Sequence, residues 1–163
     1  MNIEIEKGLG SLSAGVSRID GLYSKWAQKH GNTYGVIQVL YALKLGGTVT
    51  QKQISESCEI PKQTVNSVIK QLKADKHISL VANNEDKREK KIKLTPLGET
   101  YAQKLLTPFF ELNEMVVSKV GMDLLQNLSK GLKTLGDTLE MEMEIKEVSL
   151  KWEAKIKTNM EKK

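Results

Sequence analysis

The segment that most constrains the fold of this chain reads PKQTVNSVIKQL and runs from Pro61 to Leu72. Its apolar residues recur at the i, i+3, i+4 and i+7 spacing that places side chains on one face of an α-helix. The other face carries amide, hydroxyl and lysine side chains, and no acidic residue lies between Glu59 and Asp75. We therefore predict a helix over residues 61–76 whose outer face is free of carboxylates as far as residue 74. The apolar face consists of Val65, Val68, Ile69 and Leu72.

A shorter helix is predicted just before this one. Thr50 is a good N-cap residue for the segment QKQISESC, and Pro61 suits the first turn of the helix that follows. Two helices joined by about three residues are typical of a helix-turn-helix.

A β-hairpin is predicted directly after the helix-turn-helix. One β-prone run begins at Ile78, and in a second run Ile92 and Leu94 alternate with lysines. Between the two runs, the sequence NNED supplies turn-forming residues. The predicted hairpin, over residues 78–95, has a charged tip.

Helices are predicted on both sides of this central region. Apolar residues from Leu9 to Trp26 alternate steps of three and four, which is typical of a long amphipathic helix. The segment from Val36 to Leu45 is apolar on most sides and should form a core helix. After the hairpin, Thr95 and Pro96 suit the start of a helix of about 25 residues. Pro108 should kink this helix, Gly121 should end it, and the chain is helical again from Met122.

Positive charge is concentrated in the central region. The 163-residue chain carries 25 basic and 20 acidic residues, a net charge of +5. Segment 62–93 alone has nine basic and four acidic residues, so its net charge is also +5. Such a basic patch is expected of a phosphate-binding surface, although the solvated surface of a soluble protein would look the same.

Several classes of protein are disfavoured by the sequence. With one cysteine, Cys58, the chain cannot form an intramolecular disulfide. The N-terminus lacks the pattern of a signal peptide, and the longest apolar run, VIQVLYAL, is too short to cross a bilayer. We find no nucleophile elbow, phosphate loop or metal-ligand spacing. We therefore expect a cytoplasmic protein without membrane contact, which is not an enzyme and has no metal or cofactor.

Three motifs, in the order in which they follow one another along the chain, resemble the MarR family of bacterial transcription regulators. The members of this family are dimeric winged helix-turn-helix proteins. The first is the segment TVTQKQISESCEIPKQTVNSVIKQLKADKHI. The second is Asp86-Lys87-Arg88, which matches the family's Asp-x-Arg at the tip of the wing, and the third is LTPLGE, like the family's Leu-Thr-x-x-Gly. The chain departs from the family at His77, where a glycine is usual, and at Ser67, where an arginine is frequent.

The resemblance implies a mainly α fold with a small β-hairpin wing. The winged helix-turn-helix lobe would span residues 33–98, between helical dimerisation regions over residues 1–32 and 99–163. The chain would bind a palindromic operator in double-stranded DNA as a homodimer, and most regulators of this family are repressors. Helix 61–76 would enter the major groove and wing 78–95 the minor groove. The alternative is a helical protein–protein interaction module that uses the winged lobe to bind a protein partner.

The outer face of the predicted recognition helix supplies candidate DNA contacts. Gln and Asn side chains can pair bidentately with adenine, and Thr can meet the methyl group of thymine. The alternative is that the residues of this face are ordinary solvent-facing positions. The candidates are Lys62, Gln63, Thr64, Asn66, Ser67 and Lys70.

Further candidates lie in the wing and at the start of the first helix of the helix-turn-helix. Arg88 is expected to enter the minor groove, where negative potential is concentrated. Asp86 would hold this arginine or the turn in place, unless it is a turn former only. Side chains at the helix N-terminus and along the wing would contact phosphates. These phosphate candidates are Gln51, Lys52, Lys87, Lys90 and Lys91.

The flanking helices raise the questions of dimerisation and sensing. Their apolar stripes exceed what a small central lobe can cover, so we expect them to pair between subunits, with packing inside one subunit as the alternative. Regulators that resemble this family often bind a small-molecule effector between the dimer arms and the DNA-binding lobe. Candidate pocket residues are Tyr23, Trp26, Tyr34 and Tyr41, although aromatic residues at helical spacing also suit a core.

Overall fold

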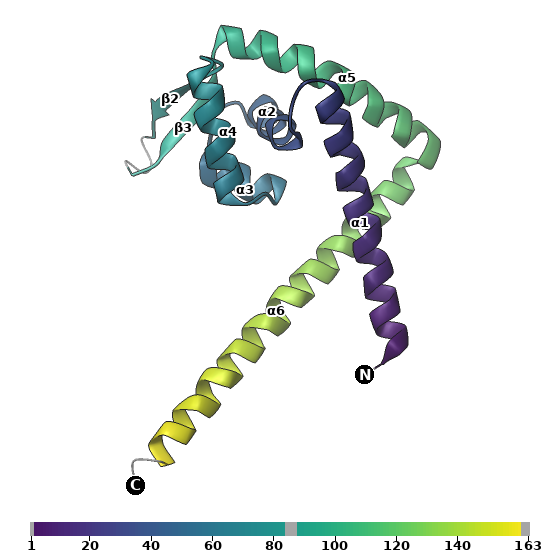
Figure 1. Cartoon of the computed structure of the whole chain (residues 1–163), viewed down its shortest axis with the longest axis vertical. Helices are drawn as coiled ribbons and strands as arrows, with labels where there is room; N and C mark the ends of the chain where they lie inside the picture. The colour runs from purple at the N-terminus through teal and green to yellow at the C-terminus, as the bar shows by residue number, and fades with distance from the viewer. Residues whose placement is uncertain (1, 84–87, 161–163) are drawn as a thin grey trace. The chain divides into compact units, whose positions relative to one another are not determined.

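The computed structural model of the chain is mainly helical, with one small antiparallel sheet (Figure 1). It describes residues 2–83 and 88–160, and the side chains of residues 2–83 and 88–147. The predicted fold class, mainly α with a β-hairpin, is confirmed. In chain order the elements are α1 (Ile3–Lys29), α2 (Tyr34–Gly46), β1 (Val49–Thr50), α3 (Gln51–Cys58), α4 (Lys62–Ala74), β2 (Ile78–Ala82), β3 (Lys90–Leu94), α5 (Pro96–Val120) and α6 (Met122–Met160).

The chain divides into two compact units, Met1–Phe110 and Glu111–Lys163. The first contains α1 to α4, the sheet and the first part of α5. The second contains the rest of α5 and all of α6.

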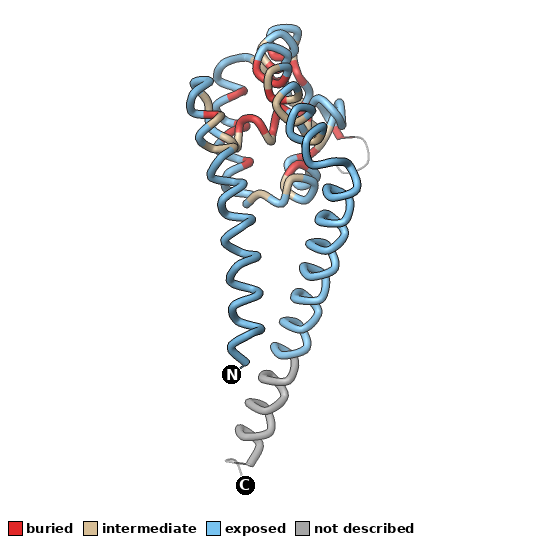
Figure 2. The backbone as a smooth tube through the Cα atoms, turned by 90° about the vertical axis from the view of Figure 1, so that its right-hand side faces the viewer, coloured by how far each residue is buried: buried red, intermediate tan, exposed pale blue. Residues whose placement is uncertain are grey.

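The core of the first unit is built around α2, as the apolar stretch in this part of the sequence predicted. Ile37, Leu40 and Leu43 are fully buried on this helix. All four residues of the predicted apolar face of α4 are also buried. The buried residues gather in this part of the chain, which Figure 2 shows in red. The packing leaves the opposite face of α4 exposed.

The helix-turn-helix forms as predicted, and reciprocal hydrogen bonds fix the start of its first helix. The Thr50 hydroxyl accepts from the Gln53 N–H at 3.2 Å, and the Gln53 side-chain oxygen accepts from the Thr50 N–H at 2.8 Å. This is a capping box. The chain turns between α3 and α4 at Glu59, which has a left-handed backbone with φ of 50°. Pro61 lies at the N-cap position, so α4 starts one residue later than predicted.

Helix α4 ends in a Schellman motif that has a lysine at the position where glycine is usual. The N–H of His77 donates to the Leu72 carbonyl at 2.8 Å, and the N–H of Lys76 donates to the Lys73 carbonyl at 3.1 Å. Lys76 has a φ of 58°, in the left-handed region. The prediction that the helix reaches residue 76 was wrong by two residues, because Lys76 turns the chain out of the helix.

The sheet has one strand more than the predicted hairpin. Its order is β1-β3-β2, and both neighbouring pairs are antiparallel. Strand β1 pairs Val49 with Ile92 and Thr50 with Lys91. Because Thr50 is also the N-cap of α3, the base of the wing is joined directly to the start of α3.

Helix α5 starts directly beside the end of α4. Its first residue is Pro96, and the hydroxyl of Thr95 accepts a hydrogen bond from the Gly98 N–H at 3.0 Å. A Cβ atom at Gly98 would lie 1.8 Å from the carbonyl oxygen of His77, so only glycine permits this approach. Helix α5 continues through Pro108 as far as Val120. Gly121, with a φ of 85°, separates it from α6, as predicted.

Large apolar side chains remain exposed on the flanking helices. On α1 they recur from Ile3 to Leu22, and in the second unit from Met115 to Ile145. Figure 2 shows the first two thirds of α1 and the described part of α6 in the colour of exposed residues. None of the described helices has the length and apolar character needed to cross a bilayer.

Candidate nucleic-acid interface

The outer face of α4 carries the six predicted candidates for DNA contact, and all six side chains are exposed. At 3.6 residues per turn, Gln63, Ser67 and Lys70 project opposite the buried face, whereas Asn66 lies toward one flank. The first turn of α4 contains no acidic residue. Polar hydrogen-bonding groups without a carboxylate therefore lie along the centre of this face.

One candidate on α4 has a second role in packing. A Cβ atom at Gly35 of α2 would lie 3.2 Å from the Cγ2 methyl of Thr64 and 3.6 Å from Val68. The methyl group of Thr64 therefore lies close to α2, where Gly35 leaves room for it. The methyl group of Thr64, through which this residue would contact a thymine, therefore lies on the side that faces α2.

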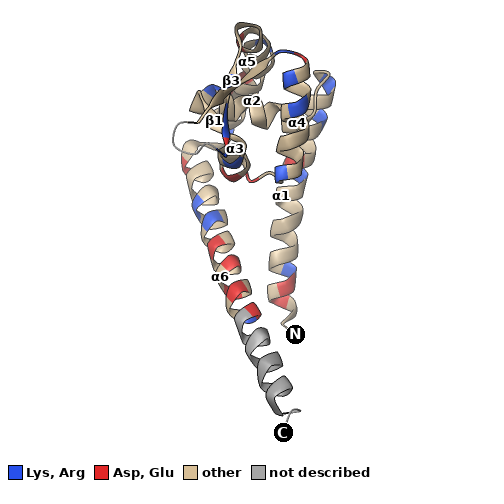
Figure 3. Ribbon diagram, turned by 90° about the vertical axis from the view of Figure 1, so that its left-hand side faces the viewer, with Lys and Arg blue, Asp and Glu red and all other residues tan. Residues whose placement is uncertain are grey.

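The wing adds basic residues beside the helix-turn-helix. Arg88 and Lys90 are exposed, and Lys91 is partly buried. Figure 3 shows Lys and Arg residues on α4 and along the sheet of this lobe. The other two wing-tip candidates, Asp86 and Lys87, lie outside the described residues.

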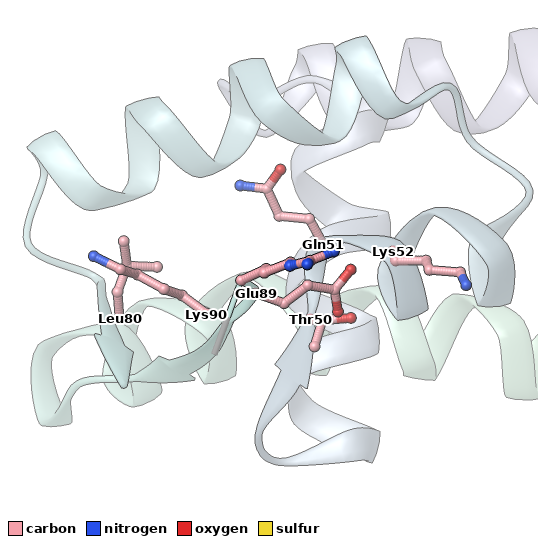
Figure 4. A pocket seen from close by; sticks show the side chains of 7 residues that line it. Thr50, Gln51, Lys52, Leu80, Glu89 and Lys90 are labelled. Carbon is pink, nitrogen blue, oxygen red and sulfur yellow. The ribbon is translucent and has the colours of Figure 1, made fainter. Parts of the chain in front are cut away.

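A hollow of about 380 Å³ lies between the start of α3 and the base of the wing. Figure 4 shows the lining side chains around this space. Three of them are cationic and one is a carboxylate, so the lining has an excess of positive charge. The carboxylate of Glu56 lies 3.8 Å from the Lys52 ammonium, one turn away on α3. The lining residues are Thr50, Gln51, Lys52, Leu80, Arg88, Glu89 and Lys90.

Comparisons with known proteins agree with this architecture. A family model described as the MarR family matches residues 30–89. The structure of NMB1585, a MarR family regulator from Neisseria meningitidis, is 29% identical with a TM-score of 0.75, and the match covers 88% of this chain and 97% of that chain.

This chain has the fold of a MarR-family transcriptional regulator. The resemblance drawn from the three motifs is thus confirmed. S. aureus MepR in a DNA-binding conformation also has a MarR-like fold, with 19% identity, a TM-score of 0.65 and coverage of 80% of this chain and 98% of that chain. So does Bordetella bronchiseptica BpsR, with 21% identity, a TM-score of 0.64 and coverage of 80% and 98%. Curated proteins give no match to the sequence.

The Leu-Thr-x-x-Gly motif of the MarR resemblance has a clear structural role in this lobe. The Thr95 hydroxyl donates to the Lys76 carbonyl at 2.7 Å, and the Thr95 N–H donates to the His77 carbonyl at 3.0 Å. With the close approach at Gly98, these bonds attach the start of α5 to the end of α4. The motif therefore fixes the end of α4 to α5, the helix that leads into the second unit.

Three of the four aromatic candidates for an effector pocket lie together in this MarR-type fold. The rings of Tyr23 and Tyr34 stack with centroids 5.3 Å apart, and Tyr23 and Trp26 each contact Phe109 at 5.4 Å. Tyr41 is more exposed and contacts Phe110 instead, at 5.9 Å. The cluster packs against the core and connects α1, α2 and α5.

Burial changes the acidity of this cluster. Burial, together with the smaller effects of the nearby Tyr23, Asp20 and Cys58, raises the pKa of Tyr34 to about 12. The thiol of Cys58 is partly buried and donates a weak hydrogen bond to the carbonyl of Gln38 at 3.6 Å. Among the described residues, no three His, Cys, Asp or Glu side chains come together as potential metal ligands.

Proposed function

We propose that this chain is a sequence-specific regulator of transcription that binds double-stranded DNA as a homodimer and represses at a palindromic operator. The winged lobe, residues 33–98, is the DNA-binding part, and the helices on either side of it form the dimer. The observation that carries the proposal is the exposed, carboxylate-free face of α4 beside a basic wing.

The major groove is the site that suits α4. A B-DNA major groove admits one α-helix, and amide side chains can read adenine there by paired hydrogen bonds. Gln63, Ser67 and Lys70 point away from the core, so they would meet base edges or phosphates first. Asn66 would reach a base edge at one side of the helix. Arg88 and the wing would lie in the adjacent minor groove.

The hollow between α3 and the wing suits a phosphate of the DNA backbone. Two of its three cations are Lys52 on α3 and Lys90 on β3, and these elements are held together by the pairing of β1 with β3. Phosphate contacts of this kind fix the register of a protein on DNA. A phosphate in the hollow would therefore set how deeply α4 enters the groove.

The exposed apolar residues of the flanking helices support the homodimer. On α6 the exposed leucines recur in steps of three and four, as in the seam of a coiled coil. More than one third of the surface of each of these leucines is exposed, and burial of that apolar surface under a partner helix is favourable. The leucines of this seam are Leu125, Leu128, Leu132, Leu135 and Leu139.

A small-molecule effector would act at the aromatic cluster of the first unit. BpsR, with a similar fold, has its DNA binding regulated by 6-hydroxynicotinic acid. By analogy, a planar ligand could displace the stacked rings of Tyr23 and Tyr34 or extend their stack. Because Tyr23 belongs to α1 and Tyr34 to α2, such a ligand would contact both helices. Release from the operator would follow from a shift between these helices.

Selection of bound duplexes from a randomised DNA pool, at physiological salt, tests the proposal. A recovered palindrome with half-sites about one helical turn apart would support a dimeric operator-binding regulator. A pool that stays random but binds in a salt-dependent way would contradict sequence specificity. Absence of binding would favour a protein-interaction role for the winged lobe.

A further inference from the structure

Tyr101 of α5 connects two parts of the first unit that are far apart in sequence. Its ring lies parallel to that of His77, with an angle of 1° between the planes and 4.2 Å between the centroids. Its hydroxyl donates a hydrogen bond to the side-chain oxygen of Asn32. One side chain therefore contacts both the end of the recognition helix and the turn between α1 and α2.

The His77 side of this connection is rigid. The N–H of His77 is bonded to Leu72 inside α4, and its carbonyl oxygen accepts a hydrogen bond from Thr95. The same carbonyl leaves no room for a Cβ atom at Gly98. A displacement of the His77 backbone must therefore move the C-terminal end of α4 or break these contacts.

The Asn32 side is attached to α1 in the same way. The N–H of Asn32 donates to the carbonyl of Ala27 at 3.0 Å, and its side-chain N–H donates to the carbonyl of His30 at 3.1 Å. Ala27 is fully buried in the core. The acceptor of the Tyr101 hydroxyl is thus fixed to the last turn of α1.

We propose that Tyr101 is a positioning residue for DNA recognition, which holds the C-terminal end of α4 at a fixed place relative to the end of α1. The role rests on the proposed function, because it concerns how α4 meets the bases. Burial raises the pKa of Tyr101, an effect that the hydrogen bond to Asn32 partly offsets and that Asp75 reinforces. The hydroxyl therefore remains a donor at neutral pH.

The role predicts a specific kind of defect. Paired hydrogen bonds to base edges require placement within about 0.5 Å, whereas phosphate contacts act largely through charge and tolerate small displacements. A recognition helix with a loosened end should therefore lose operator affinity but keep its affinity for random DNA. Replacement of a residue needed only for folding would instead lower the affinity for the operator and the affinity for random DNA together.

The test compares Tyr101→Phe with the wild type and with Thr100→Val, which removes a hydroxyl from the neighbouring, exposed position of α5 as a control. Each protein is first shown by circular dichroism to be folded at the assay temperature. Affinities are then measured on the selected operator and on a random duplex, across a range of salt concentrations. Loss of one hydrogen bond should weaken operator binding by roughly tenfold in Tyr101→Phe, with random-duplex affinity and salt dependence unchanged. Thr100→Val should match the wild type on both duplexes.

A double-mutant cycle with Asn32→Ala identifies the partner of the hydroxyl. If Tyr101 acts through Asn32, the double variant should bind the operator about as weakly as the weaker of the single variants. Fully additive losses would overturn the proposal, as would unchanged operator binding or an equal loss on both duplexes. If the wild type itself prefers no duplex, the proposed function and this role both fail. A wild-type preference retained by Tyr101→Phe would reject the role of Tyr101 alone.

Discussion

The carbonyl oxygen of Lys76 accepts a hydrogen bond from the hydroxyl of Thr95 at 2.7 Å, while Lys76 itself has a left-handed backbone. This pair joins the end of α4 to the start of α5. It also explains how α4 ends with a left-handed residue that is not glycine.

Replacement of the left-handed lysine by glycine should stabilise the protein. A lysine at a φ of 58° has a steric cost that glycine avoids, so Lys76→Gly should raise the free energy of unfolding by about 1 kcal/mol. Urea unfolding followed by circular dichroism measures the change. Lys76→Ala removes the same charge but retains the Cβ atom, and should give no such gain. Equal stabilisation by both variants would show that the charge, not the backbone, is responsible.

A methyl group at Gly98 should be strongly destabilising. The added Cβ atom would meet the backbone oxygen of His77 at 1.8 Å, and a backbone atom cannot swing aside as a flexible side chain can. We expect Gly98→Ala to lower the free energy of unfolding by about 3 kcal/mol or more. Gly10→Ala is the control, because a Cβ atom there meets no described atom within 4 Å. Similar stability of the two variants would mean that α5 can move away from α4 at little cost.

Stability should fall at high pH because of Tyr34. Its pKa is raised from 10.0 to about 12 in the folded protein, chiefly by burial. The unfolded chain therefore loses this proton first, and the contribution is complete below pH 10 and lost as the pH rises toward 12. Urea unfolding at several pH values should show this decline, and Tyr34→Phe should reduce it. An identical decline in the variant would assign the effect to the other buried tyrosines.

Removal of the wing arginine should change how DNA binding depends on salt. Arg88→Ala should weaken binding and reduce the slope of log affinity against log salt by about one unit, since one cationic contact with the DNA is lost. Fluorescence anisotropy on the selected operator measures both quantities. Lys133→Ala, which removes an exposed cation of α6 paired with Asp137, should leave the slope unchanged. A wild-type slope in Arg88→Ala would place this residue away from the DNA.

The sequence predicted the parts of the fold that depend on local periodicity and capping. The apolar stripe of α4, the N-cap at Thr50 and the start of α5 at Pro96 all follow from residue types and spacing, and the structure confirms them. These features are local, so a single segment contains enough information to specify them.

The features that were missed depend on contacts between distant segments. Strand β1 has only two residues, too few for a recognisable alternation, and it exists because β3 is available to pair with it. The left-handed turn at Lys76 contradicts the usual preference of lysine, and hydrogen bonds from Thr95 favour it. The contact of Tyr101 with Asn32 joins residues 69 positions apart, a separation that no local pattern reveals.

The pairing of β1 with β3 also bears on how such a wing can change in evolution or by design. The pairs Val49 with Ile92 and Thr50 with Lys91 hold the wing at its base, and among the described residues the hairpin register reaches Ala82 and Lys90. Tips of different length or charge could therefore be exchanged on one unchanged lobe, and operator preference in the minor groove could be altered separately from that in the major groove.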